Sequence, residues 1–144
     1  MTYKLNDSMG YLMGKATLLM NNVFQKKLNK LNITRSQAIT LAAVWETSGV
    51  TPTELADVVG RDIPNVLRIL DKLEKKELIY RKDCKTDKRS YTVYLTEKGM
   101  MLREKIIPQA EQMAVEMLAD FEPEEIERMK DGLRKAIRSM SSSR

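Results

Sequence analysis

The chain has 144 residues, a net charge of +5 at pH 7, one cysteine and no histidine. These counts exclude a Ser-His-Asp or Cys-His catalytic pair and an intramolecular disulfide, and a zinc site would have only carboxylates as ligands. The sequence also contains no phosphate-binding glycine loop, no apolar run of about eighteen residues for a membrane span and no signal-peptide pattern. We therefore expect no enzymatic activity, no cofactor, no metal and no membrane association, and a location in the cytoplasm.

The first predicted element is a helix over residues 8–31. Its apolar residues recur at three- and four-residue steps, which is the spacing of one helix face. Three lysines lie near its end: Lys26, Lys27 and Lys30. Two interpretations of them stay open, contact with phosphates or a helix surface that lysines keep soluble.

A second helix is predicted over residues 36–47, beginning at a cap provided by Thr34. We expect its tryptophan, Trp45, to pack in the core. A position beside a ligand crevice is the alternative for this side chain.

Residues 51–77 are typical of a helix-turn-helix, in which a tight glycine turn joins two helices. Thr51 is the predicted N-cap of the first helix, followed by proline and then by Glu54 in a capping box. Gly60 is predicted to end this helix, because glycine readily adopts the left-handed conformation of a helix end.

The second helix of the motif has one apolar and one polar face. Pro64 suits its first turn, and either Asp62 or Ile63 caps it. Four apolar residues at i, i+3, i+4 and i+7 predict the face toward the core: Val66, Ile69, Leu70 and Leu73. The opposite face is polar and able to read bases through Asn65, Arg68 and Lys72.

Residues 78–99 have two β-patterned runs around a basic tip. The second run alternates apolar and polar residues from Tyr91 to Thr96, the period of a half-buried strand. Residues 81–89 carry more bases than acids, with Arg81, Lys82, Lys85, Lys88 and Arg89 against Asp83 and Asp87. The pattern predicts a two-stranded wing that contacts a polyanion, and a solvated hairpin tip is the alternative.

Two further helices are predicted, one over residues 97–119 that tolerates Pro108 with a kink, and one from Glu122 to Met140. Residues 99–144 hold more acids than bases, so we do not expect them to bind nucleic acid. One winged-helix core cannot cover the apolar faces of these helices and of residues 8–31. We infer a homodimer whose interface joins both ends of the chain.

The order of helix-turn-helix, basic wing and LTEKG at Leu95–Gly99 resembles the MarR family of bacterial transcription regulators over nearly the whole chain. The other specific segments are Asp87-Lys88-Arg89 and LDKLEKKELIYRK at 70–82. The chain departs from the family at Glu77, where relatives usually have glycine. We expect a positive φ at this residue or a different turn.

The resemblance implies a mainly α fold with a small β-wing, a winged helix-turn-helix with six helices that dimerises through its N- and C-terminal helices. Within a single unit of residues 1–144, we expect a dimerisation helix at 8–31 and dimerisation helices at 97–140. The DNA-binding core between them is expected at 34–98.

The resemblance also implies residue roles. The second helix of the motif enters the major groove with Arg68, Arg89 of the wing reaches the minor groove, and Asp87 holds the tip in shape. The full set of expected DNA contacts is Arg61, Pro64, Asn65, Arg68, Lys72, Lys85, Lys88 and Arg89.

These expectations describe a sequence-specific regulator of double-stranded DNA, most often a repressor, that binds a palindromic operator as a homodimer and associates with the nucleoid when bound. The alternatives are a winged helix for protein contact and a sequence-neutral, nucleoid-type DNA binder. The ten methionines predict adaptable core and interface packing, or a crevice for a small aromatic or amphipathic effector. Cys84, in the wing, is expected to be a plain exposed thiol, with redox sensing as the alternative.

Overall fold

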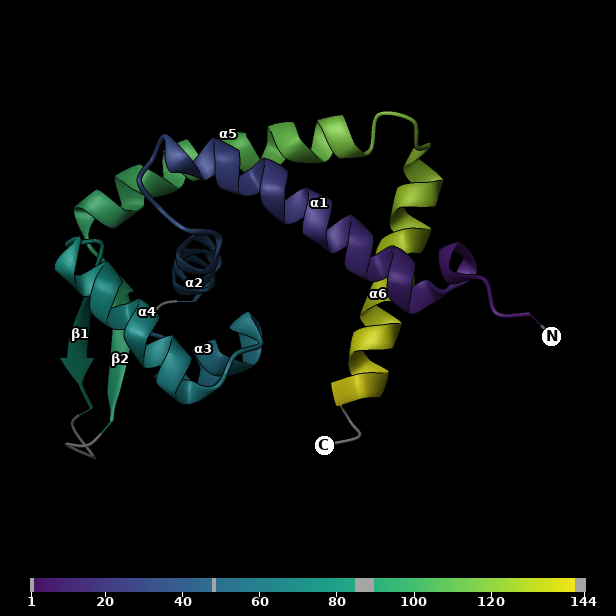
Figure 1. Cartoon of the computed structure of the whole chain (residues 1–144). Coiled ribbons are helices and arrows are strands. Elements are labelled where there is room, and N and C mark those ends of the chain that lie inside the picture. The colour runs from purple at the N-terminus through teal and green to yellow at the C-terminus, as the bar shows by residue number, and fades with distance from the viewer. Residues whose placement is uncertain (1, 48, 85–89, 142–144) are drawn as a thin grey trace.

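The computed structural model describes residues 2–47, 49–84 and 90–141, which form six α-helices, a short 3-10 helix and one two-stranded sheet (Figure 1). The elements in chain order are η1 (Leu5–Asp7), α1 (Met9–Asn29), α2 (Arg35–Glu46), α3 (Pro52–Val59), α4 (Ile63–Lys75), β1 (Ile79–Asp83), β2 (Tyr91–Leu95), α5 (Glu97–Met117) and α6 (Pro123–Ser141). The predicted mainly α architecture with a small wing is confirmed. α5 continues through Pro108 and ends at Met117, slightly before the predicted boundary.

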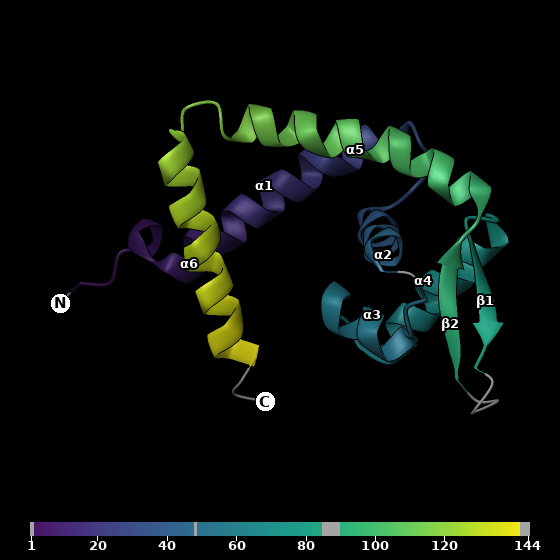
Figure 2. The ribbon, with the colours of Figure 1, turned by 180° about the vertical axis from the view of Figure 1, so that it is seen from behind.

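The two long helices α1 and α5 lie side by side across the top of the molecule (Figure 1, Figure 2). Below them lie α2 and then α3, α4 and the two strands. α6 descends at the end of the molecule that is opposite the wing, and both chain ends lie on that side. Among the described helices, none has the length and apolar character required to cross a membrane.

The helix ends follow from local hydrogen bonds. The hydroxyl of Thr51 caps α3 by accepting a bond from the amide of Glu54 at 3.2 Å, and it donates to the Glu54 carboxylate at 3.0 Å. Gly60 ends α3 with a φ of 70°, as the sequence predicts. Of the two candidate caps of α4, Asp62 is the one used, because its carboxylate accepts from the amide of Asn65 at 2.9 Å.

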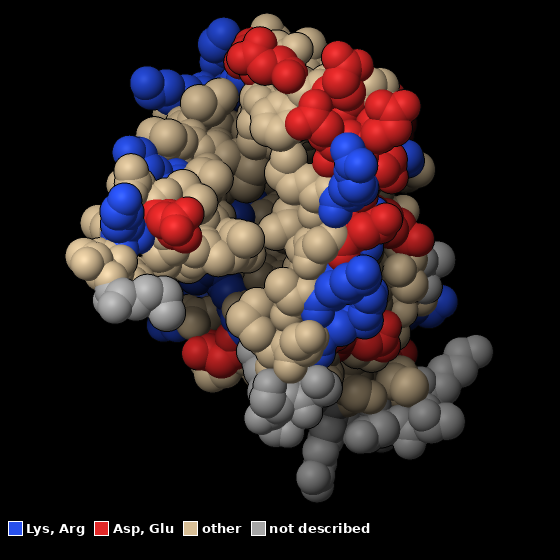
Figure 3. All heavy atoms as spheres, turned by 90° about the vertical axis from the view of Figure 1, so that its right-hand side faces the viewer, with Lys and Arg blue, Asp and Glu red and all other residues tan. Residues whose placement is uncertain are grey.

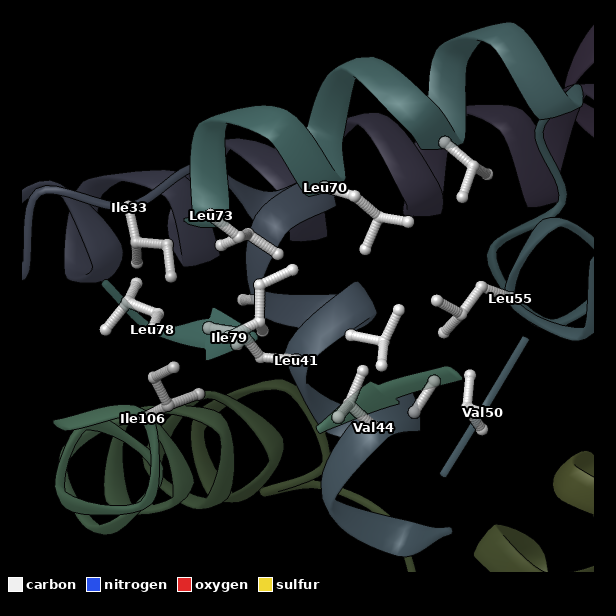
Figure 4. Packing of buried hydrophobic residues seen from close by; sticks show 14 of the residues in the cluster. Ile33, Leu41, Val44, Val50, Leu55, Leu70, Leu73, Leu78, Ile79 and Ile106 are labelled. Carbon is white, nitrogen blue, oxygen red and sulfur yellow. The ribbon is translucent and has the colours of Figure 1, made fainter. Parts of the chain in front are cut away.

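The core lies between α2, α4, the strands and the middle of α5 (Figure 4). The apolar face predicted for α4 is the one that packs there: Val66, Leu70 and Leu73 are buried and Ile69 is partly buried. Trp45 is half-buried and packs against this core, with the Arg103 guanidinium 5.7 Å from its ring centroid.

The start of α5 is fixed against the start of the wing. Thr96 donates from its amide to the carbonyl of Leu78 at 3.1 Å and from its hydroxyl to the carbonyl of Glu77 at 2.6 Å. A Cβ atom on Gly99 would lie only 2.2 Å from the Leu78 carbonyl oxygen, so this close approach requires glycine. Glu77 has a φ of 62°, the positive value that was one of the two outcomes expected for this non-glycine residue.

Candidate nucleic-acid interface

Residues of the polar face predicted for α4 line one side of a hollow. Four of the predicted DNA contacts line it, Arg61 from the turn before α4 and Asn65, Arg68 and Lys72 from α4. The hollow has a volume of about 290 Å³ and is closed on its other side by residues at the start of α2. Arg61, Arg68 and Lys72 are exposed, so the structure gathers three cationic side chains where a phosphate or a base edge could approach.

Hydrogen bonds within this group orient the side chains. The Asn65 amide oxygen accepts a bond from the Arg68 guanidinium, and the Asn65 backbone is held by Asp62. An asparagine that reads adenine uses both its amide oxygen and its amide nitrogen, whereas an arginine reads guanine with one edge of its guanidinium. In this conformation the Asn65 amide oxygen is occupied by Arg68, so Asn65 orients the Arg68 guanidinium.

Pro64 lies in the first turn of α4 and is exposed. It can contribute only apolar contacts to a ligand, because it has neither a polar side chain nor an N–H group. Its place beside Asn65 puts it at the same end of the helix as the hollow.

Arg81 does not belong to the basic tip, which corrects the sequence prediction. Its guanidinium forms ion pairs with Asp71 and Glu74 of α4, and Nε lies 3.2 Å from the Glu74 carboxylate. The guanidinium also lies 4.9 Å from the ring centroid of Tyr91 and donates to its hydroxyl at 3.1 Å. The strand register pairs Arg81 with the buried Val93, so Arg81 lies on the inner face of the wing.

These contacts settle the charge of Arg81. Partial burial by itself lowers the pKa of the guanidinium, but the hydrogen bond to Asp71 and the nearby Tyr91, Glu74 and Asp71 together raise that pKa above its ordinary value. The side chain thus stays charged and links α4 to the wing.

The remaining wing predictions lie outside the described residues: Lys85, Asp87, Lys88 and Arg89. The strands that carry them are described, pair in antiparallel register from Ile79 with Leu95 to Asp83 with Tyr91, and extend past α4 (Figure 1). The thiol-bearing residue Cys84 is partly buried, and its amide donates to the carbonyl of Ser90 at 3.0 Å.

Sequence reasoning missed the α2 side of the hollow, which is lined by Thr34, Ser36 and Gln37. Thr34 was identified only as a cap, and it does form a capping box with Gln37. No spacing rule along the chain brings the start of α2 next to the outer face of α4, because this proximity arises from tertiary packing.

The face on which α6 lies has a different charge pattern. In Figure 3 acidic side chains gather in one part of that face, and basic groups are scattered over it. That residues 99–144 do not bind nucleic acid stays a prediction from their net charge.

The chain is similar to known regulators in sequence and in fold. A model of the MarR family matches residues 33–91. An organic hydroperoxide resistance transcriptional regulator from Bacillus subtilis (strain 168) is 31% identical over 104 residues, which are 72% of this chain and 71% of that protein.

Solved structures extend the similarity to most of the chain. The S. aureus MepR-DNA complex has a TM-score of 0.84 and 30% sequence identity, and the match covers 92% of this chain and 98% of that chain. CouR from Rhodococcus jostii RHA1, solved bound to p-coumaroyl-CoA, has the same fold, with a TM-score of 0.86 at 20% identity and coverage of 94% and 95%.

Proposed function

Because this chain belongs to the MarR family of transcriptional regulators, we propose that it is a sequence-specific repressor that binds a palindromic operator as a homodimer. The observation that carries the proposal is the hollow on the outer face of α4, where Arg61, Asn65, Arg68 and Lys72 meet. A cationic surface with an arginine and an asparagine on one helix face has the chemistry to bind phosphates and read base edges. The MepR complex shows that a relative of the same fold binds DNA.

In the proposed complex α4 lies in the major groove, where Arg68 reads a base and Lys72 contacts the backbone. The wing follows the backbone, with Lys85 and Lys88 on phosphates, Arg89 in the adjacent minor groove and Asp87 holding the tip. These wing assignments rest on the family resemblance of the sequence.

The homodimer is supported by apolar surface that the single chain leaves uncovered. α1 and α5 share a groove of about 320 Å³ whose lining is almost entirely apolar, including Leu19, Val23 and Met117. α6 stands apart from the helix-turn-helix in Figures 1 and 2, and its apolar side is exposed, with Ile137 58% and Met140 62% accessible. Such a surface on a soluble chain marks an interface.

A second chain would cover this surface, and a two-fold axis would then present two α4 helices to two half-sites. We therefore propose dimerisation segments at 8–31 and 97–140 around a DNA-binding core at 34–98. A small effector between the dimerisation helices and the core would change the distance between the α4 helices and weaken binding to a fixed operator.

Two other functions are less well supported. A winged helix for protein contact needs an apolar recognition face, and the α4 face is polar. A sequence-neutral DNA binder needs only phosphate contacts, whereas the arrangement of Asn65 and Arg68 suits base reading. MarR-family regulators are non-enzymatic transcription factors, and we place this one in the cytoplasm, at the nucleoid when bound.

The test is selection of bound duplexes from a random pool by the purified protein at two salt concentrations. Enrichment of a palindrome with a steep salt dependence is the expected result. Binding without enrichment would favour the sequence-neutral function, and no binding would favour the protein-contact function.

A further inference from the structure

A second groove lies at the corner of the molecule where α1 and α4 end and α5 begins (Figure 1). We call it the corner groove. It has a volume of about 350 Å³ and is lined by Lys76, Lys98 and Lys105 together with apolar side chains that include Leu78 and Leu102. It is far from α6 and separate from the hollow on the outer face of α4. Its size is that of a small-molecule site.

The positive charge of the corner groove is uncompensated. Among the described residues, no carboxylate forms an ion pair with any of its three lysines, although Arg81 and Lys27 elsewhere do have carboxylate partners. The Lys76 ammonium instead donates to two neutral acceptors, the Asn32 carbonyl at 2.7 Å and the Gln37 amide oxygen at 3.0 Å. The Lys98 ammonium donates to the Lys76 carbonyl at 3.0 Å.

The Lys98 ammonium is thereby held at the main chain of Lys76, and both lysines line the groove. Burial, and then the charge of Lys72, lower the pKa of the Lys76 ammonium. A bound anion would reverse this effect, because an opposite charge favours the charged form of the ammonium. The cationic end of the groove therefore has a capacity for an anion that the described residues do not use.

Most of the other residues that line the groove are apolar. Leu78 is buried and lies between Ile33 and Ile106 at the edge of the core (Figure 4). Lys98, Met101, Leu102 and Lys105 recur at i, i+3, i+4 and i+7, so they share one face of α5. The bonds from Thr96 and the close approach of Gly99 to Leu78 fix the start of α5 against the segment just before β1.

We propose that the corner groove binds a small amphipathic carboxylate, with the carboxylate between Lys76 and Lys98 and the apolar body over Leu78 and Leu102. The two oxygens of a carboxylate can accept from both ammonium groups, and the body covers leucine surface that a free inorganic anion would leave in water. This inference rests on the proposed function, because such a ligand would be an effector of the repressor, at a place other than the space between the dimerisation helices and the core.

One side chain connects the corner groove with the DNA-binding surface. Gln37, which holds Lys76, also lines the hollow with Asn65, Arg68 and Lys72. A carboxylate that draws the Lys76 ammonium toward itself competes with Gln37 for that ammonium. Gln37 then loses the bond from Lys76 and keeps only the bond from the Thr34 amide, which changes the α2 side of the hollow, and binding of the carboxylate lowers the affinity for DNA.

The first experiment measures decanoate binding to the DNA-free protein by titration calorimetry, with decanol as the uncharged probe of the same length. Decanoate should bind at one site per chain, and decanol at least about tenfold more weakly because it lacks the charge. Lys98→Gln should weaken decanoate about tenfold, and Met101→Ser, at a residue 62% exposed, should weaken it by loss of apolar contact. Lys130→Gln on α6 is the matched control and should change nothing.

Because Lys98, Met101 and Lys130 are all exposed, we expect each variant to fold, and circular dichroism checks this. Absence of decanoate binding, equal binding of decanol, or an equal effect of the Lys130→Gln control would overturn the site. DNA affinity is measured separately on the selected duplex. DNA binding without decanoate binding refutes the corner groove alone, whereas decanoate binding without DNA binding refutes the proposed function alone. If the protein binds both decanoate and DNA but neither weakens the binding of the other, the effector role is refuted.

Discussion

Replacing Arg81 with methionine should uncouple the wing from α4. Methionine keeps an unbranched apolar side chain in the same space but removes the guanidinium that contacts Asp71, Glu74 and Tyr91. The substitution leaves two carboxylates on α4 without their cation. We therefore expect a loss of stability and a loss of DNA affinity, through different physical causes.

The size of the stability loss follows from exposure. The Arg81 side chain is 25% exposed, but Asp71 and Glu74 are 61% and 48% exposed, so each ion pair is screened by water and contributes about 0–1 kcal/mol. The contact with the Tyr91 ring contributes about 0.5–1 kcal/mol. Arg81→Met should therefore lower the free energy of unfolding by roughly 0.5–3 kcal/mol, measured by urea denaturation.

A double-mutant cycle isolates the ion pairs. In a background that carries Asp71→Asn and Glu74→Gln, the cost of Arg81→Met should fall by the value of both pairs, leaving mainly the ring contact. If Arg81→Met lowers the free energy of unfolding as much in that background as in the unaltered protein, the ion pairs do not account for the effect.

DNA binding gives the second test of the same reasoning. Two unpaired carboxylates on α4 should weaken binding to every sequence, by about tenfold, but the salt dependence should keep its slope because Arg81 contacts no phosphate. Lys82→Met, which removes the neighbouring exposed cation, is the control. A slope reduced by about one unit in Arg81→Met would mean that Arg81 binds a phosphate directly, and the assignment to the wing–helix link would be wrong.

Three other substitutions test the interface and the junction behind it. Arg68→Ala should cost about 1–3 kcal/mol of discrimination between operator and random DNA in competition binding, and equal losses on both would contradict base reading by this side chain. Gly99→Ala should lower the free energy of unfolding by about 1–3 kcal/mol, because its Cβ would meet the Leu78 carbonyl at 2.2 Å, and a neutral result would show that the close approach relaxes freely. Glu77→Gly should raise the free energy of unfolding by up to about 1 kcal/mol by relieving the φ of 62°, and a lower denaturation midpoint would count against strain at this residue.

Local features were predictable because their physics spans only a few residues. A cap such as Thr51 or Asp62 acts on an amide three residues ahead, and Gly60 acts on its own φ angle, so both can be read along the chain. The apolar face of α4 follows from helical periodicity in the same way. The positive φ at Glu77 was predictable because the chain lacks the glycine usual in relatives.

The position of Arg81 was mispredicted because counting charges along a segment ignores which face of a strand each residue occupies. Strand alternation places Arg81 on the same side as Ile79, and Ile79 is 2% exposed, so the period-2 pattern contained the signal. No such pattern in the sequence indicated which residues form the α2 side of the hollow. Gln37 and Lys72 come together only because α2 and α4 pack on the same core.

The junction at Leu78 and Gly99 determines how a ligand can act on DNA binding. It fixes the wing, the end of α4 and the first turns of α5 together, so in the proposed dimer a change in the distance between the two α4 helices must be taken up elsewhere in α5 or along its contact with α1. Pro108 is the weakest point of α5, because it cannot donate a backbone hydrogen bond. A ligand in the corner groove lies at the fixed end and acts through Gln37 on the recognition surface.

Duplex selection repeated with decanoate should therefore give weaker enrichment but the same distance between half-sites. A changed distance would show that the carboxylate acts by moving the helices apart, and the coupling through Gln37 would then be refuted. Lys98→Gln should restore enrichment in the presence of decanoate, because the ligand would lose one of its two cations while Gln37 keeps Lys76.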